Sequence, residues 1–160
     1  MKKIFTAEEA SKFIVDIQKI NKTIVLVGGC FDILHIGHID FLKNAKLQGD
    51  LLLVLLEHDA TIKKRKGAKR PLNTQHDRAV ILSHLEMVDH VITLPAHTDD
   101  IFYDRLVNQL KPAIIATTAG DPYRKQKERQ AEKIGARVVD VIQPISNKST
   151  TALVHILEEL

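Results

Sequence analysis

A run of six consecutive aliphatic residues, Leu51-Leu52-Leu53-Val54-Leu55-Leu56, constrains the fold more than any other stretch. It is too short to span a membrane and has the usual length of a β-strand. A strand that is apolar at every position is buried on both faces, which is typical of parallel sheets covered by helices on both sides. The run therefore predicts an α/β protein.

Apolar segments alternate with segments of helical periodicity along the rest of the chain. A first helix is predicted after Thr6, with Glu9 completing a capping box. Further strands are predicted at residues 23–27, 91–94, 113–116 and 137–142, and further helices up to residue 47 and at 75–87, 99–110, 123–134 and 150–160. The alternation predicts a Rossmann-like, doubly wound parallel sheet of about five strands with helices on both faces. We expect one domain over residues 1–160, with residues 1–21 as an N-terminal helical extension.

The composition excludes several classes of protein. A net charge of +3 is too small to indicate a nucleic-acid partner. No apolar run approaches the roughly 20 residues that a membrane span needs, and the N-terminus lacks the apolar stretch of a signal peptide. Cys30 is the single cysteine, which rules out an internal disulfide and suits a reducing compartment. We expect a cytoplasmic protein without a membrane or nucleic-acid partner.

The predicted strand at 23–27 leads into a corner that combines Gly28 and Gly29 with two histidines, His35 and His38, separated by Ile36-Gly37. A strand-to-helix corner exposes main-chain N–H groups and the positive end of a helix dipole, which favours phosphate. Two imidazoles at that position can stabilise charge during phosphoryl or nucleotidyl transfer. Three other interpretations stay open: histidines that only cap the helix, a zinc site with Cys30, and Cys30 as a nucleophile.

Polar clusters follow the predicted strands, and the carboxyl ends of parallel strands are where ligands bind. The clusters that directly follow a strand are Asp32 with His35 and His38, Asp59 with the lysines behind it, and Gly120-Asp121, whereas Ser149-Thr150-Thr151 lies a few residues beyond one. We expect them to converge on one edge of the sheet. Neither a Walker A motif nor Gly-x-Gly-x-x-Gly is present, which disfavours P-loop and dinucleotide-binding proteins.

The basic segment from Lys63 to Pro71 is predicted to be a mobile loop. It is either a solvated charge run or a loop that closes over a triphosphate. In the second case its lysines supply point charges, and Arg70 or Arg78 supplies a planar fork for phosphate oxygens.

These residues together resemble the cytidylyltransferase-like nucleotidyltransferase superfamily. Its motif is Gly-x-Phe-Asp-x-x-His-x-Gly-His, and residues 29–38 fit it throughout. The chain is most similar to the adenylyltransferases that make ADP-activated heptose from a heptose 1-phosphate. The stretches that carry this similarity are residues 59–67, Arg70-Pro71-Leu72-Asn73, Arg78, Gly120-Asp121 with Tyr123, and Ser149-Thr150-Thr151.

Two departures bear on the substrate. Glycerol-3-phosphate cytidylyltransferases carry an arginine in Arg-Thr-x-Gly-Ile-Ser-Thr-Thr, and residues 144–151 have none, which disfavours CTP. Ala119 replaces the first glycine of the heptose group's Gly-Gly-Asp-Tyr, and Pro122 is inserted before Tyr123, which leaves the sugar open. FAD synthetases share the same core and remain an alternative.

The resemblance implies transfer of a nucleotide from ATP, or CTP, to a small phosphorylated acceptor with release of pyrophosphate. It implies Mg²⁺ bound mainly through the nucleotide phosphates rather than by protein ligands. The implied catalytic residues are His35, His38, Lys63, Lys66 and Asp32. The implied nucleotide-binding residues are Gly29, Cys30, Phe31, Gly37, Arg78, Gly120, Asp121, Ser149, Thr150 and Thr151. The implied acceptor-binding residues are Asp32, Asp59, Lys63 and Arg70. A homodimer and a regulatory domain that only binds nucleotide are alternatives that the residues leave open.

Overall fold

The computed structural model describes residues 3–19 and 21–144. The triplet Ser149-Thr150-Thr151 and the helix predicted at 150–160 lie outside the described residues. None of the described helices is both long enough and apolar enough to cross a membrane.

Strands and helices alternate as predicted. The strands of the described chain are β1 (Ile4–Thr6), β2 (Ile24–Gly29), β3 (Leu51–Leu56), β4 (His90–Thr93), β5 (Ile114–Thr118) and β6 (Arg137–Ile142). The helices are α1 (Ala7–Gln18), α2 (Ile36–Lys46), α3 (Asp59–Lys66), α4 (Gln75–Ser83), α5 (Asp100–Leu110) and α6 (Arg124–Ile134). All strand pairs are parallel, and the order across the sheet is β1-β4-β3-β2-β5-β6.

The sheet has six described strands instead of about five, because β1 was not predicted. β1 has three residues and pairs with β4, some ninety residues later in the chain, through Ile4–Val91, Phe5–Ile92 and Thr6–Thr93. The capping box predicted for α1 is confirmed: Thr6 accepts a hydrogen bond from the Glu9 N–H, and the Glu9 side chain accepts one from the Thr6 N–H.

The prediction of a mobile loop from Lys63 was wrong for residues 63–66, which complete α3. His58 caps this helix by accepting the Ala60 N–H at 3.1 Å. Ile62 is fully buried and packs the helix against the rest of the protein. The acidic Asp59 stands in the first turn and four basic residues stand in the last, an arrangement that the helix dipole favours.

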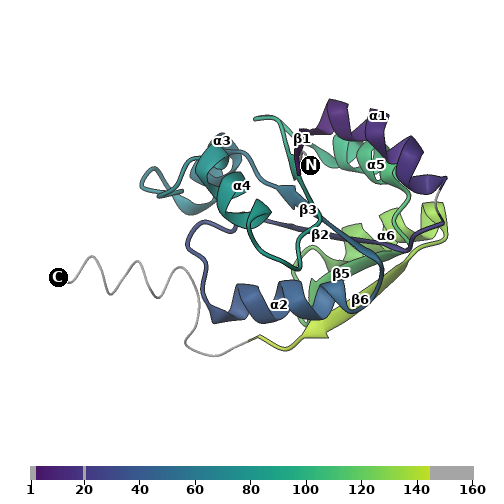
Figure 1. Cartoon of the computed structure of the whole chain (residues 1–160). Helices are drawn as coiled ribbons and strands as arrows, with labels where there is room; N and C mark the ends of the chain where they lie inside the picture. The colour runs from purple at the N-terminus through teal and green to yellow at the C-terminus, as the bar shows by residue number, and fades with distance from the viewer. Residues whose placement is uncertain (1–2, 20, 145–160) are drawn as a thin grey trace.

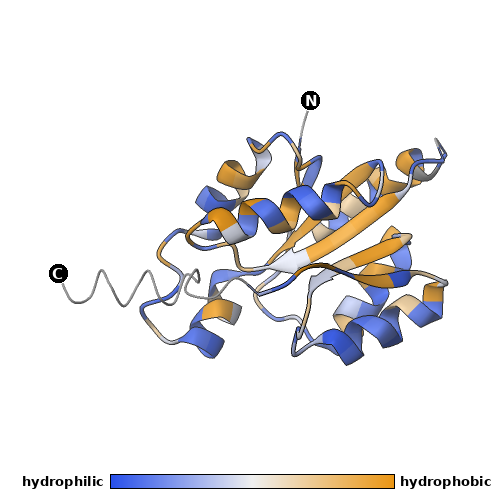
Figure 2. Cartoon of the chain, turned by 90° about the horizontal axis from the view of Figure 1, so that it is seen from below, coloured by the Kyte–Doolittle hydropathy of each residue, from blue (hydrophilic) through white to orange (hydrophobic). Residues whose placement is uncertain are grey.

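Two apolar cores lie on opposite faces of the sheet. Leu51, Leu53 and Leu55 of β3 point to the side covered by α1, α5 and α6, whereas Leu52, Val54 and Leu56 point to the side covered by α2 and α4. Figure 1 shows α1 and α5 on one side and α2 on the other. In Figure 2 the strands are hydrophobic and the outer faces of the helices are hydrophilic. The continuous apolar run is thus explained by burial on both faces.

β2 and β5 lie side by side at the point where the order of strands reverses. The chain leaves β2 toward α2 on one face and leaves β5 toward α6 on the other. Loops that depart to opposite faces leave a crevice between them, which is the usual ligand site in such sheets.

Candidate active site

A cavity of about 910 Å³ occupies this crevice. The corner after β2, the end of β3, helix α3, the start of α5, and the segment from β5 into α6 all contribute to its lining. Its volume is that of a site for a ligand of nucleotide size. The described strand-end segments therefore converge as predicted, and the residues named in advance that line the cavity are Gly29, Cys30, Phe31, His35, Gly37, His38, Lys66 and Asp121.

His35 and His38 cap the start of α2 with their Nδ1 atoms. His35 Nδ1 accepts the Gly37 N–H at 3.1 Å, and His38 Nδ1 accepts the His35 N–H at 3.4 Å. The ring centroids lie 3.9 Å apart. A neutral imidazole that accepts at Nδ1 carries its proton on Nε2. The capping bonds therefore orient both rings so that each has an Nε2–H donor available for chemistry in the cavity.

The electrostatics keep His38 neutral. Burial is the largest cause, and together with the neighbouring His35 and Lys66 it lowers the pKa of His38 from 6.5 to about 4. A neutral imidazole at a helix N-terminus can donate a hydrogen bond to a phosphate oxygen without holding a permanent charge. The capping role and the phosphate role are thus compatible in the same two residues.

This pKa predicts how stability depends on pH. The pKa of His38 is about 4 in the folded protein and near 6.5 when unfolded, so the unfolded chain takes up the proton first as pH falls. The stabilisation is complete above pH 6.5 and is lost between pH 6.5 and 4, by about 2 kcal/mol after allowance for the partial exposure of the ring. Urea unfolding of wild type and His38→Gln at pH 7 and pH 4.5 isolates the effect. Equal pH slopes in the two proteins would contradict the prediction.

Phe31 connects the glycines of the corner to His38. Its backbone has a φ of 43°, in the left-handed region, and its buried ring lies 5.4 Å from the ring of His38. A β-carbon on Gly29 would come within 2.9 Å of this ring, whereas one on Gly28 would meet nothing closer than 3.9 Å. Gly29 is therefore required by the packing of Phe31, and Gly28 is not.

We predict that Gly29→Ala lowers the free energy of unfolding by about 1–3 kcal/mol because it displaces the Phe31 ring. Gly28→Ala, the matched control one residue earlier, should change it by about 0.5 kcal/mol or less. Chemical denaturation measures both. Equal effects would show that the Phe31 contact does not determine the difference.

Asp32 was expected to be a catalytic residue, but its side chain faces the interior of the protein. It is 1% exposed and does not line the cavity. Its carboxylate accepts the Arg70 Nε–H at 2.6 Å and the main-chain N–H groups of Leu72 and Asn73. Burial raises the pKa of Asp32, but these hydrogen bonds outweigh it and hold the pKa below its usual value. Asp32 and Arg70 therefore join the corner to residues 70–73, away from any direct contact with a ligand in the cavity.

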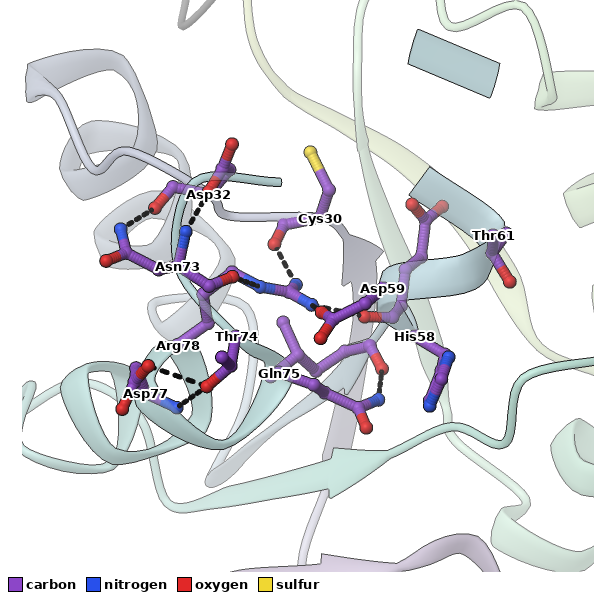
Figure 3. A network of polar contacts seen from close by, with 12 residues as sticks. Cys30, Asp32, His58, Asp59, Thr61, Asn73, Thr74, Gln75, Asp77 and Arg78 are labelled. Atoms are coloured by element: carbon purple, nitrogen blue, oxygen red, sulfur yellow. Dashed lines mark hydrogen bonds and ion pairs between the residues drawn. The ribbon is translucent and has the colours of Figure 1, made fainter. Parts of the chain in front are cut away.

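Arg78 was likewise expected to bind phosphate, but it does not line the cavity. Its side chain is fully buried, and Figure 3 shows the guanidinium enclosed by Cys30, Asp59 and Asn73. It donates to the carbonyls of Cys30, Glu57 and Asn73 and, at 2.7 Å, to Asp59. Asp59, expected to bind the acceptor, is thereby committed to Arg78 and does not line the cavity. This network ties the ends of β2 and β3 together beneath the site.

Helix α3 brings one of its two predicted lysines to the cavity. Lys66 lines it and donates to Cys30 Sγ at 3.2 Å, whereas Lys63 is exposed and lies outside the lining. On the opposite side, Asp121 accepts hydrogen bonds from Thr117 and Lys127, and the Tyr123 N–H donates to it at 2.7 Å. Gly120 has a φ of 76° and turns the chain after β5 without itself lining the cavity.

Several lining residues were not predicted. Those with polar side chains are Glu57, Thr61, Arg65, Thr98, Asp99, Asp100, Tyr103, Thr117, Thr118, Tyr123, Gln126, Lys127, Gln130 and Gln143. Thr98, Asp99 and Asp100 follow β4, so the rule that ligands bind at strand ends would have found them if applied to that strand. Arg65 was hidden within the basic run, where no periodicity separates cavity-facing from exposed residues. Among the described residues, no group of three or more His, Cys, Asp or Glu is arranged to hold a metal ion.

Residues 26–157 match the model of the family described as Cytidylyltransferase-like. The chain belongs to this family. Curated relatives include proteins named "Bifunctional protein HldE" from Nitratiruptor sp., 42% identical over 148 residues, and from Campylobacter fetus, 38% identical over 154 residues. These alignments cover 92% and 96% of this chain but only 30% and 31% of the relatives, so the chain spans about a third of their length.

Solved structures agree with this assignment. A lipopolysaccharide core biosynthesis protein from Thermoplasma volcanium is 28% identical with a TM-score of 0.62, over 78% of this chain and 98% of that one. A pantoate-beta-alanine ligase from Francisella tularensis, in a complex with beta-gamma ATP and beta-alanine, has a TM-score of 0.67 at 14% identity. The alignment covers 100% of this chain and 79% of that one and shows the fold alone. The resemblance drawn from residues 29–38 is confirmed, and this cytidylyltransferase-like chain is placed among the nucleotidyltransferase enzymes.

Proposed function

We propose that this cytidylyltransferase-like chain transfers AMP from ATP to a phosphorylated sugar of the heptose 1-phosphate kind and releases pyrophosphate. The observation that carries the proposal is the pair of histidines at the start of α2, whose Nδ1 atoms accept hydrogen bonds from main-chain N–H groups within a cavity of nucleotide size. The HldE relatives and the lipopolysaccharide core biosynthesis protein support an acceptor from lipopolysaccharide precursor synthesis.

In the proposed reaction an oxygen of the acceptor phosphate attacks the α-phosphorus of ATP. The new phosphorus–oxygen bond forms as the bond from the α-phosphorus to the bridging oxygen breaks, and pyrophosphate leaves with that electron pair. His35 and His38 donate hydrogen bonds to phosphate oxygens as negative charge accumulates on them. Lys66 adds a positive charge at the same corner, beside Cys30.

The donor set of the corner fits a metal ion that arrives with the nucleotide. The lining there consists of two imidazoles, a lysine, glycines, Cys30 and Phe31, and the nearby carboxylate of Asp32 is turned into the protein. Mg²⁺ would therefore be held by the triphosphate, where it would neutralise charge on the departing pyrophosphate. With ATP as the donor and a single cysteine, we place the reaction in the cytoplasm.

Pyrophosphate release measured with ATP and with CTP, across a panel of phosphorylated sugars and alcohol phosphates, tests the proposal. We expect release with ATP and a sugar 1-phosphate. Release only with CTP and glycerol 3-phosphate would support a cytidylyltransferase, and release with ATP and FMN would support an FAD synthetase. If no pair gives release although ATP binds, a regulatory nucleotide-binding domain becomes the better explanation.

A further inference from the structure

Arg65 lies at a position in the cavity that the proposed reaction does not yet use. It stands in the last turn of α3 and lines the cavity with 35% of its side chain exposed. Both terminal nitrogens of its guanidinium donate to the carboxylate of Glu57, at 3.0 and 2.5 Å. Its Cζ atom lies 6.0 Å from the centre of the Tyr123 ring. Arg65 therefore reaches from the end of β3 across to the segment between β5 and α6.

The other cations of the cavity are engaged elsewhere. Among the described lining residues, the side chains with a permanent positive charge are those of Arg65, Lys66 and Lys127. Lys66 contacts Cys30 at the histidine corner, and Lys127 is paired with Asp121 at 2.5 Å. Arg70 and Arg78, from which a planar fork was expected, are buried in the protein. Arg65 is thus the guanidinium that a ligand in this cavity can reach.

The pairing with Glu57 resembles the pairing that a phosphate would make. A carboxylate and a phosphate each present two oxygens to the two N–H ends of a guanidinium, and the phosphate carries more charge. A phosphorylated acceptor can therefore replace Glu57 without loss of hydrogen bonds by Arg65. A neutral hydroxyl compound cannot, because it would break an ion pair and return a weaker partner.

We propose that Arg65 binds the phosphoryl group of the acceptor, and that Glu57 holds the guanidinium in place until the acceptor arrives. The inference rests on the proposed function, since it assigns a role within the same reaction. Because an acceptor must displace Glu57 to reach Arg65, the Arg65–Glu57 pair selects phosphorylated acceptors over neutral ones. Tyr123 limits sideways movement of the guanidinium through its contact with the Arg65 head group.

The test compares Arg65→Met with Glu57→Gln, two variants that break the same ion pair. Inorganic phosphate is titrated calorimetrically into protein saturated with a non-hydrolysable ATP analogue, so that the nucleotide's own phosphate sites are occupied. We expect Arg65→Met to weaken phosphate binding about tenfold or more and Glu57→Gln to leave it unchanged or tighten it by a few fold. Lys64→Met removes an equal charge from the same helix outside this cavity and should have an effect of about twofold or less.

If the Arg65–Glu57 pair only stabilised the wall of the cavity, Arg65→Met and Glu57→Gln would weaken phosphate binding to the same extent. That result, or unchanged binding in Arg65→Met, overturns the proposal. Thermal melting of each variant separates loss of folding from loss of the phosphate contact. If phosphate binding depends on Arg65 while the wild type releases no pyrophosphate with any acceptor, the anion site stands and the proposed reaction fails.

Discussion

His38→Ala will lower turnover by on the order of 100-fold or more, because in the proposed reaction it removes a donor to oxygens that gain charge in the transition state. The cost to folding is small by comparison. His38 Nδ1 accepts one long hydrogen bond, of 3.4 Å, from the His35 N–H, and its loss is worth about 1 kcal/mol. Steady-state assays of pyrophosphate release and thermal melting measure the two effects separately.

His76→Ala is the matched control, since His76 is an exposed histidine of α4 outside the cavity. Its turnover should equal that of wild type. A His38→Ala protein with near-normal turnover would show that the histidine corner only caps α2. A protein that loses turnover and stability together would show that capping and chemistry cannot be separated at this position.

Arg78→Met will produce the largest loss of stability among the site residues, about 3–5 kcal/mol, because it leaves Asp59 and three carbonyl oxygens without their donor. In a chain of this length such a loss corresponds to a fall of roughly 10 °C in melting temperature. Calorimetry or thermal circular dichroism measures it directly.

Arg105→Met makes the same chemical change at an exposed residue of α5, and we expect it to melt within about 1–2 °C of wild type. A different result would support the expectation from the sequence that Arg78 binds phosphate. If Arg78→Met kept its melting temperature but lost affinity for ATP, the guanidinium would have to leave its buried position and contact phosphate directly.

The elements that the sequence predicted well are those whose signal is local. Leu51–Leu56 shows burial in every residue, and Thr6 with Glu9 marks the start of α1 within four positions. β1 has no such signal, because three residues become a strand only through pairing with β4. α3 was missed for a related reason: its basic composition is that of a solvated loop, and a single buried residue, Ile62, fastens it.

The site residues likewise divide into those with a local signal in the sequence and those without one. His35, Gly37 and His38 could be assigned because their spacing and their place after a strand both indicate phosphate chemistry. Arg70 and Arg78 were predicted from residue type and from the family resemblance, and neither tells whether a guanidinium faces a cavity or the interior. Arg65 was overlooked among four consecutive basic residues, since its role depends on Glu57 and Tyr123, which approach it only in the folded protein.

The pairing along β2 has a mechanical consequence. β2 pairs with β3 from Ile24 to Gly29, but its register with β5 covers only Val25 and Leu26. Beyond Leu26 the two halves of the sheet separate, and the cavity begins there. A ligand that contacts both the corner after β2 and the segment after β5 would therefore link the two halves of the sheet at the described strand pair that has the shortest register. Under a pulling force applied to β6, the protein without ligand should separate between β2 and β5 before its other described strand pairs separate.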